Sequence, residues 1–327
     1  MGAVSELVYL SRDQVAALSP EIPQLIALLE QVFREKAAGR TEMPPKIGIH
    51  PEKDAFLHAM PAFLPALRAA GLKWVSAFPE NRGRGLPTIA GLIVLNDPET
   101  GLPLAVMDAS WITAKRTAAA AASALAARHL ARPDSRILGI LGCGVQGQSH
   151  LEALLALFPI REVRAYDTDE EAGERFATEA EARFRVLAAR VNDPRKAVSG
   201  CDLVVTAGPI LREPHATIRP GWLEAGAFAS LVDFDSYWDR AALREVDKWC
   251  TDDLKQLEHY KTLGYFRDVP PVYAELADLV TGRKPGRESP EERTMACHLG
   301  LALEDVALAG HIYREALEKK IGTWLPR

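Results

Sequence analysis

The chain has 327 residues, of which 48% are hydrophobic and 25% are charged. This length predicts about two domains, and the composition is that of an average globular protein, which argues against disordered and fibrous structure. The 39 basic and 44 acidic residues give a formal charge of −5, which argues against a nucleic-acid-binding protein.

The cysteines and the apolar segments indicate the compartment. Cys143, Cys201, Cys250 and Cys297 are widely spaced and form no CxxC pair, so we expect free thiols, with neither a disulfide framework nor a metal site. The first ten residues lack the basic start and apolar run of a signal peptide. The longest apolar tract is shorter than the ~20 residues that a membrane span requires. We therefore expect a cytoplasmic protein without membrane contact.

The first third of the chain combines a helix with short strands. Apolar residues recur at three- and four-residue spacing over 11–36, which predicts the helix. Turn residues at 96–101 predict a hairpin, and the short connections favour an antiparallel sheet. The predicted strands are 46–50, 55–60, 72–77, 88–96 and 103–108.

From Ser110 onward the pattern changes to alternating helices and strands. The alanine-rich segment 110–130 predicts a helix that ends before Pro133. Nearly continuous apolar strands alternate with amphipathic helices, which is typical of a parallel sheet covered on both faces. A last helix at about 290–319 is long enough to return to the first domain. The strands are predicted at 136–141, 162–167, 185–191, 202–207, 227–232 and 248–251, and the intervening helices near 146–157, 170–182, 193–199 and 241–246.

A glycine motif lies directly between a predicted strand and a predicted helix. It reads Gly142, Cys143, Gly144, Val145, Gln146, Gly147. In this context glycine permits a tight turn and close approach of a dinucleotide diphosphate, whose charge meets the N–H groups at the helix N-terminus. The alternative is a glycine turn with only a structural role.

The next predicted strand ends in Asp167. An acid at this point accepts hydrogen bonds from the ribose hydroxyls of NAD and repels a 2′-phosphate. Thr168, Asp169 and Glu170 follow without a basic residue, which favours NAD over NADP. Thr206, at the end of the fourth strand of this region, lies where a dinucleotide crosses the sheet. The alternative reading of Asp167 is a helix cap.

These features predict an α/β fold with a doubly wound parallel sheet of the Rossmann type, inserted in a second α+β domain built from both chain ends. The predicted boundaries are 1–115 plus 305–327 for the domain built from both chain ends and 116–304 for the NAD-binding domain.

Several separate segments resemble the ornithine cyclodeaminase/mu-crystallin family, and within it archaeal-type alanine dehydrogenases and imino acid reductases. Their order along the chain makes a chance match improbable. Besides the glycine motif, the matching segments are 43–46, 71–75, 85–88, 98–108, 116–117, 286–289 and 304–307.

The resemblance implies a homodimer, a dimerisation and substrate domain made from the chain ends, and chemistry at the Cα–N bond of an amino or imino acid. Three activities are compatible with it. The first is an NAD-dependent amino acid dehydrogenase or imine reductase. The second is a cyclodeaminase-type ammonia lyase that uses NAD internally, and the third is an NAD-bound ligand-binding protein of the mu-crystallin type.

Family positions also imply roles for individual residues. Lys46 and Arg116 would hold the substrate carboxylate. Lys73 would hydrogen-bond the carboxylate or transfer a proton, and Asp235 would face the substrate amine. Thr88 and Thr117 would contact the cofactor. On charge pattern alone, Arg116 is a solvated helix residue and Lys73 an edge-strand lysine whose ammonium reaches water.

The chain departs from its relatives after Asp235. They continue with Pro-Gly-Lys, whereas Ser236, Tyr237, Trp238 and Asp239 follow here. Asp233 competes with Asp235 for the catalytic role. His298 occupies a position where relatives carry a small polar residue, and it is either a structural histidine or a substrate contact that titrates near neutral pH. These departures bear on the substrate rather than on the cofactor.

Overall fold

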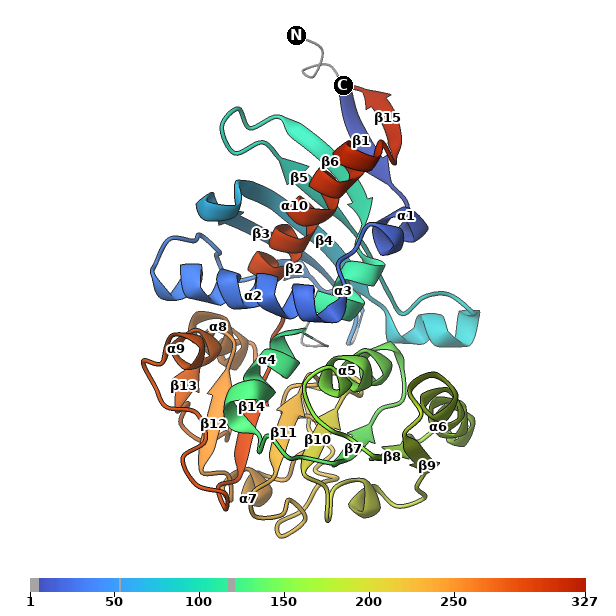
Figure 1. Ribbon diagram of the computed structural model, residues 1–327, viewed down its shortest axis with the longest axis vertical. Coiled ribbons are helices and arrows are strands. Elements are labelled where there is room, and N and C mark those ends of the chain that lie inside the picture. The colour runs from blue at the N-terminus through green and yellow to red at the C-terminus, as the bar shows by residue number, and fades with distance from the viewer. Residues whose placement is uncertain (1–5, 53, 117–120) are drawn as a thin grey trace. The chain divides into compact units, whose positions relative to one another are not determined.

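The computed structural model describes residues 6–52, 54–116 and 121–327. It divides at 117/118 and 299/300 into two compact units, the first formed by both chain ends and the second by the intervening segment (Figure 1). The first division lies slightly after the predicted boundary at 115/116, because Arg116 still ends a helix of the first unit. The second lies slightly before the predicted boundary at 304/305, because Gly300 directly precedes Leu301, the N-cap of the last helix.

Within the described residues, seven strands form the sheet of the first unit, in the order β15-β1-β6-β5-β4-β3-β2. Neighbouring strands are antiparallel, except that β1 and β6 are parallel. The antiparallel sheet predicted from the hairpins is therefore present, and both chain ends extend it. The strands are β1 (Glu6–Leu10), β2 (Ile47–Ile49), β3 (Phe56–Leu64), β4 (Ala69–Ala77), β5 (Ile89–Asn96), β6 (Pro103–Asp108) and β15 (Thr323–Pro326).

Helices of the first unit cover one face of this sheet. Figure 1 shows α10 crossing the sheet, and it packs on β3, β4 and β5. The single helix predicted over 11–36 is two helices, because Pro20 lacks the N–H that a continuous helix needs there. The helices are α1 (Arg12–Ala17), α2 (Ile22–Ala37), α3 (Ser110–Arg116) and α10 (Ala302–Lys319), with short 3₁₀ turns η1 (Pro65–Leu67) and η2 (Pro79–Arg84).

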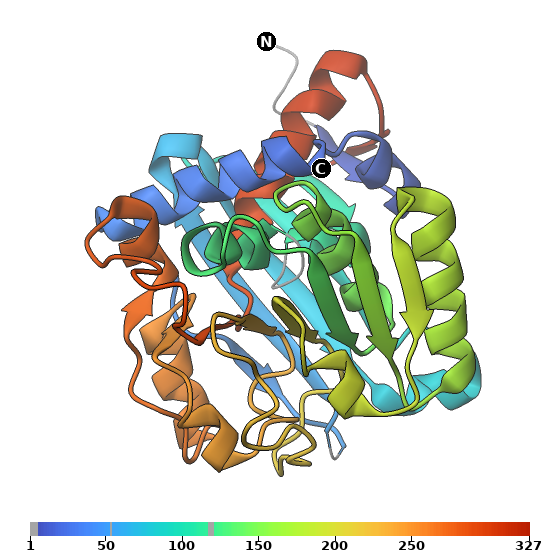
Figure 2. The ribbon, with the colours of Figure 1, turned by 60° about the horizontal axis from the view of Figure 1, so that its bottom comes forward.

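The second unit holds an eight-stranded sheet, counted over the described residues, in the order β13-β12-β14-β11-β10-β7-β8-β9 (Figure 2). Every neighbouring pair is parallel. The chain winds outward from β7 in both directions, so the fold is doubly wound with its switch point between β7 and β10. The strands are β7 (Ile137–Leu141), β8 (Glu162–Tyr166), β9 (Leu187–Arg190), β10 (Leu203–Thr206), β11 (Phe228–Leu231), β12 (Lys248–Thr251), β13 (Ala274–Glu275) and β14 (Thr294–Cys297).

Of the two remaining long helix predictions, the one over 290–319 was wrong in extent. The helix predicted over 110–130 is described as α3 and α4, with 117–120 outside the described residues. The helix predicted over 290–319 includes β14, which is entirely buried between β11 and β12 and therefore pairs as a strand. The remaining helices are α4 (Ala121–Leu130), α5 (Val145–Leu155), α6 (Glu170–Phe184), α7 (Arg240–Leu243), α8 (Leu254–Thr262) and α9 (Leu276–Thr281), with the 3₁₀ turn η3 (Pro194–Ala197).

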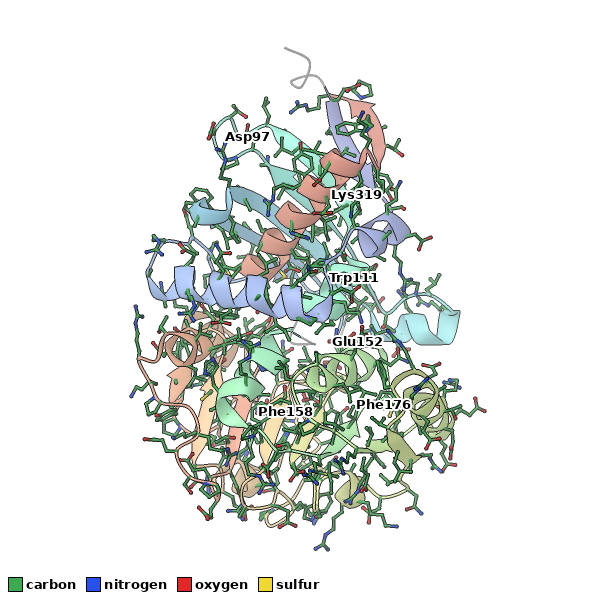
Figure 3. The ribbon with its side chains drawn as sticks, in the orientation of Figure 1. Asp97, Trp111, Glu152, Phe158, Phe176 and Lys319 are labelled. Atoms are coloured by element: carbon green, nitrogen blue, oxygen red, sulfur yellow. The ribbon has the colours of Figure 1, made fainter. Side chains whose placement is uncertain are left out.

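The cysteines and the helices can be compared with the sequence predictions. All four cysteines are free thiols, as predicted, and the structure buries each of them. Among the helices of the described residues, none has the length and apolarity needed to cross a bilayer. Figure 3 shows the side chains that fill both units.

Candidate functional site

The glycine motif forms the turn between β7 and α5. Gly142 has φ 100, and a Cβ atom there would lie 2.6 Å from the carbonyl carbon of Ala207, after β10. A Cβ atom at Gly147 would collide with the carbonyl oxygen of Gly142, whereas one at Gly144 would meet open space. Gly142 and Gly147 therefore permit close packing, and Gly144 leaves open space beside the backbone.

The start of α5 has the features of an anion-binding helix end. Its N-cap, Gly144, provides no side-chain cap, and Val145 in the first turn is 61% exposed. The side-chain oxygen of Gln146 is buried and has no hydrogen-bond partner among the described residues. Uncapped N–H groups at a helix N-terminus favour a phosphate group. This turn therefore fits a dinucleotide diphosphate.

Asp167 connects the end of β8 to the glycine turn. Its carboxylate accepts hydrogen bonds from the backbone N–H of Cys143 at 2.8 Å and of Asp169 at 2.9 Å. Each carboxylate oxygen has about two acceptor sites, so both oxygens can still accept a ribose hydroxyl. The acid is held in place by the same turn that would hold the diphosphate.

A second carboxylate lies at the ends of β10 and β11. Asp233 is fully buried and accepts hydrogen bonds from the Thr206 hydroxyl at 2.6 Å and from the Gly208 N–H at 3.1 Å. Burial raises the pKa of Asp233 to about 7. Because Gly142 packs against Ala207, this group adjoins the glycine turn.

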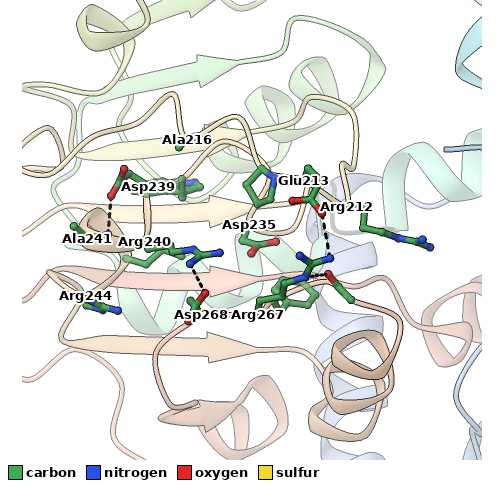
Figure 4. A pocket seen from close by; sticks show the side chains of 15 residues that line it. Arg212, Glu213, Ala216, Asp235, Asp239, Arg240, Ala241, Arg244, Arg267 and Asp268 are labelled. Atoms are coloured by element: carbon green, nitrogen blue, oxygen red, sulfur yellow. Dashed lines mark hydrogen bonds and ion pairs between the residues drawn. The ribbon is translucent and has the colours of Figure 1, made fainter. Parts of the chain in front are cut away.

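Asp235 has different surroundings. It lines a cavity of about 420 Å³ in the second unit, and Figure 4 shows it between two ion pairs, Arg240–Asp268 at 2.7 Å and Arg267–Glu213 at 3.1 Å. Burial raises the pKa of its carboxyl group, while the N–H of Phe266 and the two arginines oppose the rise. The contacts of Asp235 thus belong to the loops around this cavity, and those of Asp233 to the edge of the sheet.

In the first unit, Lys73 is a buried cation. Its side chain is 1% exposed, and its Nζ lies 2.8 Å from Oδ1 of Asp305 on α10, which is 0% exposed. Thr113 Oγ1, on α3, is 3.5 Å from the same nitrogen. Lys73 is therefore not an edge-strand lysine that reaches water, and its charge is stabilised inside the unit.

The sheet register brings Lys46 into line with Lys73. Ile47 on β2 pairs with Ala59 on β3, and Met60 on β3 pairs with Lys73 on β4. Lys46, one residue before Ile47, therefore reaches the row of Met60 and Lys73, two strand spacings or about 10 Å from Lys73 along the sheet. Lys73 lies on the face that α10 covers, because its ammonium group contacts Asp305 of that helix.

The remaining residues with a predicted role are Arg116, Thr117 and Thr88. Arg116 ends α3, and Thr117 lies outside the described residues. Thr88 is exposed just before β5, and its carbonyl accepts the N–H of Phe78. Their predicted contacts with substrate or cofactor stay predictions.

His298 is buried directly after β14 and does not titrate near neutral pH. Burial and the nearby His150 lower its pKa to about 3. Neither ring nitrogen has a hydrogen-bond partner among the described residues. His298 is therefore a neutral, buried side chain, and we do not expect it to titrate near neutral pH.

Two contacts, one in each unit, were not predicted from the sequence. Asp305 is the buried partner of Lys73, and an acid on the apolar face of the last helix could have indicated it. Gly208 donates to Asp233 and contacts Tyr237, a proximity that no local pattern predicts.

These features define a class of protein: the second unit is a doubly wound α/β fold with a dinucleotide-binding turn at its switch point, and the first unit of the same chain contains a buried lysine–aspartate pair. Residues 8–320 match the ornithine cyclodeaminase/mu-crystallin family. The chain belongs to this family.

Relatives of nearly full length support this assignment. Alanine dehydrogenase of Archaeoglobus fulgidus is 38% identical over 97% of this chain and 98% of its own. The Δ1-pyrroline-2-carboxylate reductase of Thermococcus litoralis, solved with NADH and L-proline, is 33% identical, with a TM-score of 0.90 over 97% of this chain and 99% of its own. An archaeal alanine dehydrogenase dimer with bound NAD is 36% identical, with a TM-score of 0.86 over 98% and 99% of the two chains.

The Lys73–Asp305 pair allows a test of stability. Replacing Asp305 by Asn removes the negative charge of this buried ion pair, so the free energy of unfolding should fall by about 3–5 kcal/mol. Chemical denaturation measures this change. As control, Glu99→Gln breaks the exposed Arg68–Glu99 pair and should cost about 0–1 kcal/mol. Replacing the whole pair with apolar residues, Lys73→Met with Asp305→Leu, should regain most of the lost stability. Equal stability of Asp305→Asn and Glu99→Gln would show that the buried pair does not stabilise the fold.

Proposed function

We propose that this chain is an NAD-dependent oxidoreductase that transfers hydride to or from the nitrogen-bearing carbon of an amino or imino acid. The glycine turn with Asp167 behind it is the observation that carries the proposal, because it fits the diphosphate and ribose of a dinucleotide. The alanine dehydrogenase and pyrroline-2-carboxylate reductase relatives support the reaction class. A cytoplasmic location is proposed with it.

NAD is proposed in preference to NADP. Asp167 carries a negative charge where a 2′-phosphate would lie, and the residues after it are Thr168, Asp169 and Glu170. A 2′-phosphate would meet repulsion there and find no adjacent cation.

The chain's own residues would position the substrate. When bound, the nicotinamide supplies or accepts the hydride. We assign Lys46, Lys73 and Arg116 to the substrate carboxylate, because three cations can hold it in one orientation. Fixed orientation can contribute about 7–11 kcal/mol, more than the ~3–5 kcal/mol that corresponds to the 10²–10⁴-fold effect of proton transfer. Binding geometry is therefore the larger proposed contribution.

The carboxylate that faces the substrate nitrogen has two candidates. Asp235 has the family position, and we propose it for holding the amine and relaying its proton. Asp233 is the second candidate, because it is bonded to Thr206 and Gly208 at the sheet edge beside the glycine turn. With its pKa raised to about 7, Asp233 could both hold and release a proton near neutral pH.

The reaction class can be tested with purified protein and a panel of amino acids. We expect NADH absorbance to rise with NAD and one amino acid, such as alanine or proline, and to fall with NADH and the matching imino acid. Ammonia release from ornithine or lysine at constant NADH would instead identify an internal-redox lyase. Dinucleotide binding without turnover of any substrate would indicate a ligand-binding protein.

Matched variants distinguish the two carboxylates. Asp235→Asn should lower kcat by about 10²–10⁴-fold if Asp235 transfers the proton. Asp233→Asn should then have a smaller effect on kcat, and the lower limb of the pH–rate profile should be unchanged. The opposite result, loss of a group that titrates near pH 7 in Asp233→Asn alone, would transfer the role to Asp233.

We also propose that the protein is a homodimer. The sheet face opposite α10 carries an exposed apolar row that runs across β2, β4 and β5, formed by Ile47, 68% exposed, Trp74, 42% exposed, and Leu92, 44% exposed. A contiguous apolar surface of this kind is typical of a protein interface. The archaeal alanine dehydrogenase relative, solved as a dimer, supports this interpretation.

The dimer proposal predicts the effect of a charge in this row. Trp74→Glu should shift the mass measured by light scattering from two chains to one, because a buried unpaired carboxylate opposes association. Leu187→Glu, at an exposed leucine of the second unit, is the control and should leave the mass unchanged. A wild-type protein that is already a single chain at micromolar concentration would rule out the dimer.

A further inference from the structure

Tyr237 lies against the turn that follows β10. A Cβ atom built at Gly208 would lie 2.6 Å from Cε2 and from the hydroxyl oxygen of Tyr237, and 2.7 Å from Cζ. The outer end of the phenol ring therefore fills the space beside Gly208. No side chain larger than hydrogen fits at Gly208 unless this ring moves.

Tyr237 lies near two carboxylates at the edge of the sheet, those of Asp233 and Asp167. Gly208 donates its N–H to Asp233, and the preceding Ala207 packs against Gly142 of the glycine turn. The charges of Asp233 and Asp167 both act on the Tyr237 hydroxyl. The phenol is therefore near enough to both acids for their charges to raise its pKa.

A dinucleotide bound in a doubly wound fold follows this same course. Its adenosine ribose meets the acid after the second strand, its diphosphate meets the glycine turn, and its nicotinamide half crosses the switch point. In this chain these points are Asp167, the turn at Gly142, and the turn at Gly208. The ring of Tyr237 lies along that path.

The backbone around Tyr237 holds the ring in place. Its carbonyl accepts the N–H of Ile218 at 2.8 Å, and the hydroxyl of the preceding Ser236 accepts the N–H of Leu211 at 2.8 Å and donates to the carbonyl of Asp233. The segment after β11 is thereby joined to the segment after β10. Burial and the nearby acids raise the pKa of Tyr237 to about 12, so the phenol is neutral at physiological pH.

We propose that Tyr237 is a positioning residue whose ring forms a wall of the dinucleotide site over Gly208 and packs against the nicotinamide half of the bound cofactor. A flat, half-buried phenol offers a large apolar contact to a ribose or nicotinamide ring. It adds no charge beside the diphosphate. This inference rests on the proposed NAD-dependent function and assigns Tyr237 to the cofactor, whereas the sequence pattern associated the segment after Asp235 with the substrate.

NADH binding, measured by fluorescence on the full chain, tests the inference. Tyr237→Ala should weaken NADH binding by about tenfold or more, because the ring contact is lost. Tyr237→Phe should bind within about twofold of wild type, since the ring is retained. In turnover, KM for the cofactor should rise in Tyr237→Ala, with KM for the amino or imino acid nearly unchanged. Tyr273→Ala is the matched control, at a half-buried tyrosine beside β12, and should leave the affinity unchanged.

A double variant tests whether the two residues act at one contact. Gly208→Ala should displace the ring and weaken NADH binding, and this loss should largely disappear when Gly208→Ala is made in Tyr237→Ala. Unchanged or tighter binding in Tyr237→Ala would overturn the inference, the latter by showing that the ring obstructs the site. Additive losses in the double variant would also overturn it. If wild-type protein itself bound no NADH, the proposed function would fail first, and the inference with it.

Discussion

The backbone at Gly142 packs directly against the backbone at Ala207, leaving no space for a Cβ atom. This contact joins the turns that follow β7 and β10, the two strands on either side of the switch point. Because these turns touch, the polar groups that follow β8, β10 and β11 meet at one edge of the sheet. Asp167 accepts the N–H of Cys143 there, and Asp233 accepts the N–H of Gly208. A larger residue at position 142 would separate the turns and the acids held by them.

Two buried charged groups, one in each unit, are stabilised in different ways. In the first unit, Lys73 and Asp305 form an ion pair that connects β4 to α10, so two opposite charges lie side by side. In the second, Asp233 has hydrogen-bond donors but no cation among the contacts described, and its pKa rises to about 7. The first arrangement maintains two full charges inside the unit. The second produces a carboxyl group that can change its protonation near neutral pH, a property suited to acid–base chemistry.

Much of the fold and part of the site could be predicted from local patterns. The strand, the glycine motif and the acid after the next strand predicted the parallel sheet and the dinucleotide turn, because their spacing reflects local backbone geometry. The boundary errors have physical causes as well. Segment 294–297 is a strand because it is enclosed between β11 and β12, and residues near it in sequence carry no sign of that enclosure. The partner of Lys73 is 232 residues away, so no local spacing could identify it.

The sequence by itself determined the elements, the class of fold and the residues of the glycine turn, since these depend on side-chain periodicity and on where glycine is required. Only the tertiary structure decided which distant groups share a site. It brought Asp233 into hydrogen bonds with Thr206 and Gly208. It placed Asp235 among the arginines of a cavity, although the two acids are only two residues apart in the sequence. It also brought Tyr237 against Gly208. The reason is physical: at the end of a strand the chain turns, so neighbouring side chains point into different surroundings, and those surroundings are built by segments far away in the sequence.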